Sequence, residues 1–124
     1  MTTYREWETE VGQILEGLMA VLNRCQRTCN TECASALLAD ADQLLAVSRH
    51  VETWIKLHPC PYPDIDTQLA RLARSYSLLG ASMDLLAHEA SRIDWPVIDG
   101  ELHLLHQSMA RMVTMMHEQS MRQE

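Results

Sequence analysis

The sequence contains no phenylalanine, only four glycines and four prolines, and ten basic residues against seventeen acidic ones. The scarcity of glycine and proline excludes collagen-like and low-complexity chains, and an apolar content of 47% excludes intrinsic disorder. The shortage of basic residues gives a net charge of −7. Because a protein that binds nucleic acid without sequence preference needs a basic face, we do not expect direct nucleic-acid binding.

Long hydrophobic runs are also missing. No apolar segment approaches the roughly 18 to 20 residues that a membrane-spanning helix requires, so no membrane partner is expected. The first residues mix Arg5 with Glu6, Glu8 and Glu10, which is unlike the basic start and apolar stretch of a secretory signal. We therefore expect a cytoplasmic protein. Its four cysteines should be free thiols, since 124 residues can build a core without disulfides or metal.

What the chain does contain is four stripes of apolar residues with the three- and four-residue spacing of amphipathic helices. The stripes predict helices over residues 4–29, 32–57, 65–93 and 97–121 of one domain, 1–124. The first stripe comprises Trp7, Val11, Ile14, Leu18, Val21 and Cys25, widened on one side by Leu15, Leu22 and Cys29. The clearest break is the segment His58–Pro63, whose three prolines remove backbone donors and disfavour helix. Four similar helices with short corners predict an all-α fold, an antiparallel up-down-up-down four-helix bundle.

Three cysteines recur at intervals of four, namely Cys25, Cys29 and Cys33. If one helix ran through them, their thiolates could hold copper, or zinc with His103 added. The spacing resembles the helical Cys-x-x-x-Cys pattern of four-helix copper-storage proteins over about nine residues, although the other stripes here are Leu, Ile, Met and Ala. The resemblance implies a copper site, and the ligand chemistry leaves zinc open as well. In the alternative interpretation Cys25 and Cys29 are small buried apolar residues and Cys33 is a corner residue, because the Asn30-Thr31 pair favours a helix end.

The signatures of catalysis and of common cofactors are missing. The sequence has no Gly-rich phosphate loop, no Gly-x-Ser-x-Gly elbow, no Glu-x-x-His pair and no Cys-x-x-Cys-His haem motif. We therefore predict a protein that is not an enzyme and needs no cofactor. Cys60 beside His58 is the one candidate for thiol chemistry, and a rigid proline-fixed corner is the alternative interpretation of that loop.

We expect instead a small acidic protein-interaction module: an adaptor, chaperone, regulator or inhibitor that offers helix faces to a protein partner. The excess of acidic residues favours a basic partner. A phage- or plasmid-encoded inhibitor is one form that such a module could take. The same helix faces could also form a homodimer. The candidate contact residues are tryptophans near helix ends and methionines off the main stripes: Trp7, Met19, Trp54, Trp95 and Met115. The tryptophans could alternatively close the ends of the core.

Overall fold

The structure, a computed structural model, describes residues 3–123. These residues form four long helices, one short 3-10 helix and no strand, so the predicted all-helical class is confirmed. The elements are α1 (Tyr4–Thr31), α2 (Ala34–Leu57), α3 (Pro63–Ala87), η1 (Ala90–Arg92) and α4 (Trp95–Gln123).

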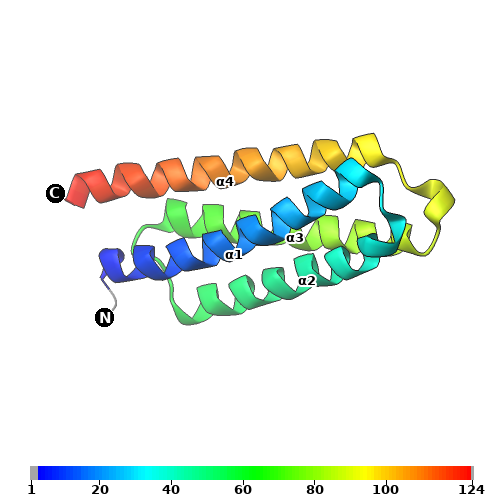
Figure 1. The fold of residues 1–124 in the computed structure, drawn as a ribbon. Coiled ribbons are helices and arrows are strands. Elements are labelled where there is room, and N and C mark those ends of the chain that lie inside the picture. The colour runs from blue at the N-terminus through cyan, green and yellow to red at the C-terminus, as the bar shows by residue number, and fades with distance from the viewer. Residues whose placement is uncertain (1–2, 124) are drawn as a thin grey trace.

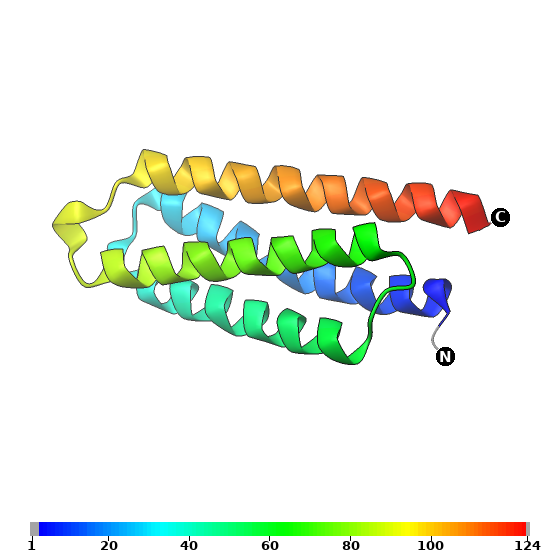
Figure 2. The ribbon, with the colours of Figure 1, turned by 180° about the vertical axis from the view of Figure 1, so that it is seen from behind.

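The helices lie side by side, and the chain turns back at each connection, so that the start of α1 and the end of α4 lie at the same end of the molecule (Figures 1 and 2). α1 packs against α2 and α4, and α3 packs against the same two helices. The contact between α2 and α3 is by far the most extensive. A four-helix bundle fits this arrangement.

The core is built largely from the expected stripes, although Ile55, Leu86 and Ala90 at the ends of their stripes are not buried, and α1 shows a further change. Leu15 and Leu22, which the spacing places at the side of the stripe, are buried, whereas Ile14 and Val21 are only half-buried. Helix α1 is therefore turned so that Ile14 faces the boundary between α1 and α2 rather than the centre of the bundle. The remaining core residues come from all four helices and include Leu44, Leu69, Leu72, Tyr76, Leu102 and Met112.

The corner between α3 and α4 differs from the prediction that the third helix continues to residue 93. Helix α3 ends at Ala87, where the next two backbone N–H groups bond to carbonyls three residues back, and η1 follows. Ile93, which follows η1, still packs against the core, whereas Ala90 of the expected stripe is exposed in the 3-10 turn. The Asp94 carboxylate accepts a hydrogen bond from the Val97 N–H and caps α4.

The corner between α1 and α2 lies two residues later than predicted. Helix α1 ends at Thr31 instead of residue 29, α2 begins at Ala34 instead of residue 32, and Glu32 between them has left-handed backbone angles (φ 51°, ψ 43°). The N–H of Glu32 bonds to the carbonyl of Cys29, and the N–H of Cys33 bonds to that of Thr28. These two bonds form a Schellman motif, in which glycine usually occupies the position of Glu32.

Gly80 explains why α2 and α3 make the closest contact. A Cβ atom at residue 80 would lie 3.0 Å from Leu45 Cγ, 3.1 Å from Leu44 Cβ and 3.2 Å from the carbonyl oxygen of Ala41. The absence of a side chain therefore allows α3 to approach the backbone of α2. Gly80 is buried in this contact, so its poor helix propensity is offset by packing.

We expect Gly80→Ala to lower the free energy of unfolding by about 1–2 kcal/mol, because the added methyl group would be crowded against Leu44, Leu45 and the carbonyl oxygen of Ala41, and this crowding outweighs the gain in helix propensity. Gly100→Ala is the matched control, since a Cβ at that exposed site has no neighbour within 4 Å and should stabilise α4 by up to about 1 kcal/mol. Urea denaturation measures both. Equal stability of the two variants would contradict this account of the helix contact.

One polar pair is buried between α1 and α2. The hydroxyl group of Thr28 donates a hydrogen bond to the carboxylate of Asp40, which is only 2% exposed. We expect Thr28→Val to lower the free energy of unfolding by about 2 kcal/mol, because the buried carboxylate loses this donor. Thr28→Ser should retain most of the stability. The control Thr114→Val, at an exposed position of α4, should change the denaturation midpoint little. A midpoint for Thr28→Val equal to that of the control would contradict the importance of the pair.

Candidate functional site

Two open apolar grooves run along helix α1, one on each side. The α1–α2 groove has a volume of about 440 Å³ and is lined by Glu10, Gln13, Ile14, Gly17, Leu18, Val47, His50, Val51 and Trp54. The α1–α4 groove has a volume of about 410 Å³ and is lined by Glu8, Gly12, Leu15, Glu16, Met19, Met109, Val113, Met116 and His117. Helix α1 contributes to both, so it is the element that positions the candidate site.

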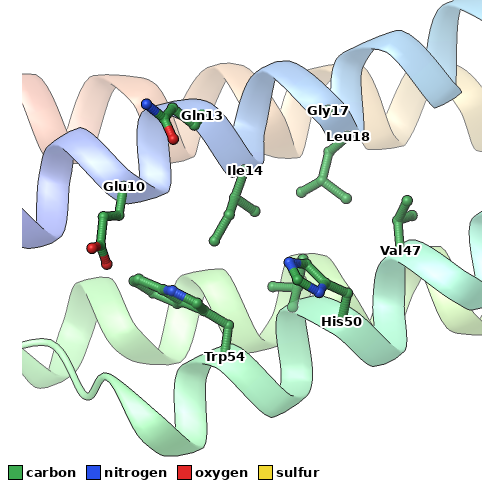
Figure 3. Close-up of a pocket in the computed structure, with 9 residues that line it drawn as sticks. Glu10, Gln13, Ile14, Gly17, Leu18, Val47, His50 and Trp54 are labelled. Carbon is green, nitrogen blue, oxygen red and sulfur yellow. The ribbon is translucent and has the colours of Figure 1, made fainter.

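Figure 3 shows the α1–α2 groove. The side chains of Ile14 and Leu18 point from α1 toward α2, and Trp54 and Val47 point back from α2. The half-buried Trp54 packs against the core and also faces the groove. Apolar side chains therefore form most of the lining, with Glu10 at the edge and the imidazole of His50 between Trp54 and Val47.

The α1–α4 groove has a floor rich in methionine. Met19 contributes to it from α1, and Met109, Val113 and Met116 contribute from α4. Val113 is 51% exposed, so part of this floor is in contact with solvent. Unbranched methionine side chains adapt easily to the shape of a partner, which makes such a surface suitable for recognition.

The rims of both grooves carry glutamates without a counter-charge from the chain itself. Among residues 3–123 the only ion pair joins Arg92 to Glu89 at 2.7 Å, outside both grooves. Glu8 and Glu16 therefore leave their negative charge at the edge of the α1–α4 groove, as Glu10 does at the α1–α2 groove. Helix α1 therefore carries negative charge along both of the grooves that it borders.

Each groove also contains a glycine that the fold does not require. A Cβ atom at Gly12 or at Gly17 would have no neighbour within 4 Å, in contrast to the crowded site of Gly80. A glycine inside a helix costs about 1 kcal/mol relative to alanine, and packing within this chain does not offset that cost at either position. Gly12 and Gly17 therefore destabilise α1 and leave open space in the grooves.

Of the residues expected to contact a partner, Trp54 lines the α1–α2 groove and Met19 lines the α1–α4 groove. The expectation for Trp7 is corrected, because this residue is fully buried and has no surface to offer a partner. Its indole Nε1–H donates a hydrogen bond of 3.0 Å to the carbonyl of His58, which ties α1 to the corner after α2. Trp7 thus closes one end of the core.

The other two expected contact residues lie away from the grooves. Trp95 is half-buried at the start of α4, and its carbonyl oxygen accepts a hydrogen bond from the Cys29 thiol at 3.4 Å. Met115 is half-buried near the end of the chain, where it lines a separate depression together with Tyr62 and Arg122. These residues do not join Met19 or Trp54 in one surface.

The spacing of apolar residues did not reveal a cluster of aromatic rings at the end of the bundle that holds the start of α1. Trp54 packs against Trp7 with ring centroids 6.0 Å apart and stacks on the imidazole of His58 at 4.8 Å. Tyr4 meets Tyr62 edge to face at 5.2 Å. The order of the helices could have predicted this cluster. In an antiparallel bundle, the start of the first helix, the end of the second and the proline-rich corner lie at the same end.

The residues of the predicted metal site are not brought together. Cys25 and Cys29 are buried, Cys33 precedes α2 outside α1, and His103 is exposed on α4. In the part of the chain that the structure describes, no three His, Cys, Asp or Glu side chains form a group that could hold a metal ion. The positions of the three cysteines agree with the alternative interpretation, two buried apolar residues and one corner residue.

The environments of the thiols differ. Burial and, to a smaller extent, the nearby Asp40 raise the pKa of Cys25 to about 12, and burial raises the pKa of Cys29. A hydrogen bond with the Ser35 hydroxyl, together with the backbone N–H of residue 36, lowers the pKa of the accessible Cys33 thiol. Cys33 is therefore the thiol with the greatest thiolate fraction near neutral pH.

Cys60 is held in the corner after α2, where its backbone N–H donates a hydrogen bond to the carboxylate of Asp66. Burial raises the pKa of its thiol, and its Sγ atom accepts a hydrogen bond from the N–H of Tyr62. The neighbouring His58 is engaged elsewhere, because its Nδ1 lies 3.1 Å from the carbonyl oxygen of Trp54 and its ring stacks on that indole. The loop thus has the features of a fixed corner.

We expect iodoacetamide at near-neutral pH to alkylate Cys33 first and Cys25 last. Only the thiolate reacts, and Cys25 combines burial with a raised pKa. Mass spectrometry of samples taken over time measures the order. Cys33→Ser should remove the fast reaction, and in denaturant all four thiols should react at similar rates. Equally fast native labelling of Cys25 would contradict the predicted protection.

Within residues 3–123 no helix combines the length and the apolar character needed to cross a bilayer. No family model, curated protein or solved structure matches this chain. The two apolar grooves along α1 are candidate binding surfaces of this chain.

Proposed function

We propose that the protein is a non-enzymatic interaction module that binds a protein partner through the grooves beside helix α1. Its role would be that of an adaptor, chaperone, regulator or inhibitor in the cytoplasm, without a cofactor and without direct contact to nucleic acid. The scaffold in this proposal is an antiparallel up-down-up-down four-helix bundle. The observation that carries the proposal is the pair of apolar grooves with unpaired glutamates at their rims.

The shape and lining of the grooves favour a protein partner over a small substrate. Sites for small molecules are enclosed and place a few polar groups so that they converge on the ligand. In the α1–α2 groove most of the lining is apolar and extends along the helices, while Glu10 lies at the edge and the imidazole of His50 lies apart from it, between Trp54 and Val47 (Figure 3). An apolar floor with a polar rim is the common composition of protein interfaces.

The openness of Gly12 and Gly17 supports the same proposal. Both glycines weaken α1, and neither is required by packing inside the chain. A binding surface is a place where such a cost is tolerated, because residues that serve recognition are often not optimal for stability. The space above each glycine allows a partner to approach the backbone of α1.

The proposal is tested with a variant in which both grooves are filled, Gly12→Leu/Gly17→Leu. Leucine is a good helix former and both sites are open, so the variant should fold and denature at or above the wild-type temperature. We expect tagged wild-type protein to recover a specific partner from native cells, and the filled variant to recover at least about tenfold less, as expected for a blocked interface centre. Quantitative mass spectrometry measures the recovery.

Gly100→Leu is the matched control, because it adds the same side chain to an open site outside both grooves. It should recover the partner as the wild type does. Failure of the wild-type protein to recover any specific partner would contradict the proposal, as would equal recovery by the filled variant. Stoichiometric copper or zinc in the purified wild-type sample would favour the metal-binding alternative instead.

A further inference from the structure

We propose that the α1–α4 groove binds an amphipathic helix whose apolar face is flanked by two basic residues about two turns apart. This inference rests on the proposed function, because it names the chemistry of the partner and the groove that binds it. It follows from the order of residues along α1, the apolar floor of the groove and the location of unpaired charge.

The residues along the α1 rim of the groove leave an opening between two glutamates. Glu8, Gly12 and Glu16 follow each other at intervals of four, so they form one row along α1 with a glycine one turn from each glutamate. Apart from Gly12 itself, its chain neighbours and the adjacent backbone of α1, no described atom lies within 4 Å of the position that a Cβ of Gly12 would occupy. A partner helix can therefore approach the backbone of α1 at the middle of the row.

The floor of the groove provides apolar contact. Helix α1 contributes Leu15 and Met19 to the floor, next to the row. Helix α4 contributes Met109, Val113 and Met116. Helices that bind in grooves use an apolar face with residues spaced by three and four. Such a face would cover the half-exposed Val113 and remove it from water.

The two glutamates favour basic residues on either side of the apolar face of the bound helix. The Cα atoms of Glu8 and Glu16 are eight residues apart, which is about 12 Å along a helix axis. Neither glutamate has a basic partner among the described residues. Lysine or arginine at positions seven or eight apart on the bound helix would reach both carboxylates, since that spacing is also two turns.

The same charges favour this groove over the α1–α2 groove, and a basic helix over a second copy of the chain. The α1–α2 groove has one rim glutamate, Glu10, and its floor includes the indole of Trp54. It therefore lacks the paired charges that would position two basic residues. A second copy of this chain is disfavoured as the occupant, because its net charge of −7 would oppose the acidic rim.

The test uses two synthetic helical peptides of about 18 residues, or five turns. Both contain the same leucine and alanine face, one with lysines at two flanking positions eight apart and the other with glutamates there. Fluorescence anisotropy measures their binding to the full chain. We expect the lysine peptide to bind at least about tenfold more tightly than the glutamate peptide.

Variants of the chain locate the site. Gly12→Leu should weaken binding of the lysine peptide about tenfold by filling the row, whereas Gly17→Leu in the other groove and Gly100→Leu should leave it unchanged. Glu8→Gln/Glu16→Gln should weaken binding several-fold and reduce its dependence on salt. Circular dichroism verifies that each variant remains helical.

Four results would overturn the inference: no binding of the lysine peptide, equal binding of both peptides, loss of binding in Gly17→Leu instead of Gly12→Leu, or a dimer of the chain that Gly12→Leu dissociates. The experiments distinguish a failure of this inference from a failure of the proposed function. If native cells supply a partner that the doubly filled variant loses, but the lysine peptide does not bind, the interaction module stands and the basic helix is wrong. If no partner is found at all, the proposed function itself fails.

Discussion

The close approach of α3 to α2 at Gly80 is the constraint on which the arrangement of the other helices depends. Because no side chain separates Gly80 from Ala41 and Leu44, these two helices pack along an extensive surface. Helices α1 and α4 then lie against this pair and against each other with smaller contacts. A bundle with one tight pair and two more loosely packed helices leaves incompletely filled space beside α1, and both grooves occur there.

Helix α1 is attached to the bundle by side-chain hydrogen bonds at both ends and at its middle. The hydroxyl group of Tyr4 donates to the carbonyl of Met116, and that of Tyr76 donates to the carbonyl of Leu18 at 3.0 Å. Near the other end, the side-chain amide of Gln26 donates to Asp99. These bonds hold α1 in place although glycines weaken it and its flanks are open. The helix can therefore present two surfaces without depending on tight packing along its whole length.

The sequence predicted the helical class, the number of helices and most of the core, because apolar residues at intervals of three and four leave few alternatives. It did not predict the end of α3 at Ala87, since the apolar spacing continues through a 3-10 turn. The site was harder to predict, because spacing alone could not determine the small rotation of α1 that leaves Ile14 half-buried beside Trp54. For Trp7 the spacing and the proposed contact role pointed in different directions, and the burial that the spacing indicates is the one found. The rotation of α1 depends on how four helices pack together, which no single stripe encodes.

The placement of the tryptophans has a further consequence for observing this molecule. Trp54 faces the α1–α2 groove and is half-buried, whereas Trp7 is inaccessible and Trp95 lies at the opposite end of the bundle. A molecule that enters that groove changes the polarity around one indole and leaves the other two in their surroundings. The ultraviolet emission of the unlabelled protein thus contains an intrinsic reporter for occupancy of one side of α1, while the opposite side is spectroscopically silent.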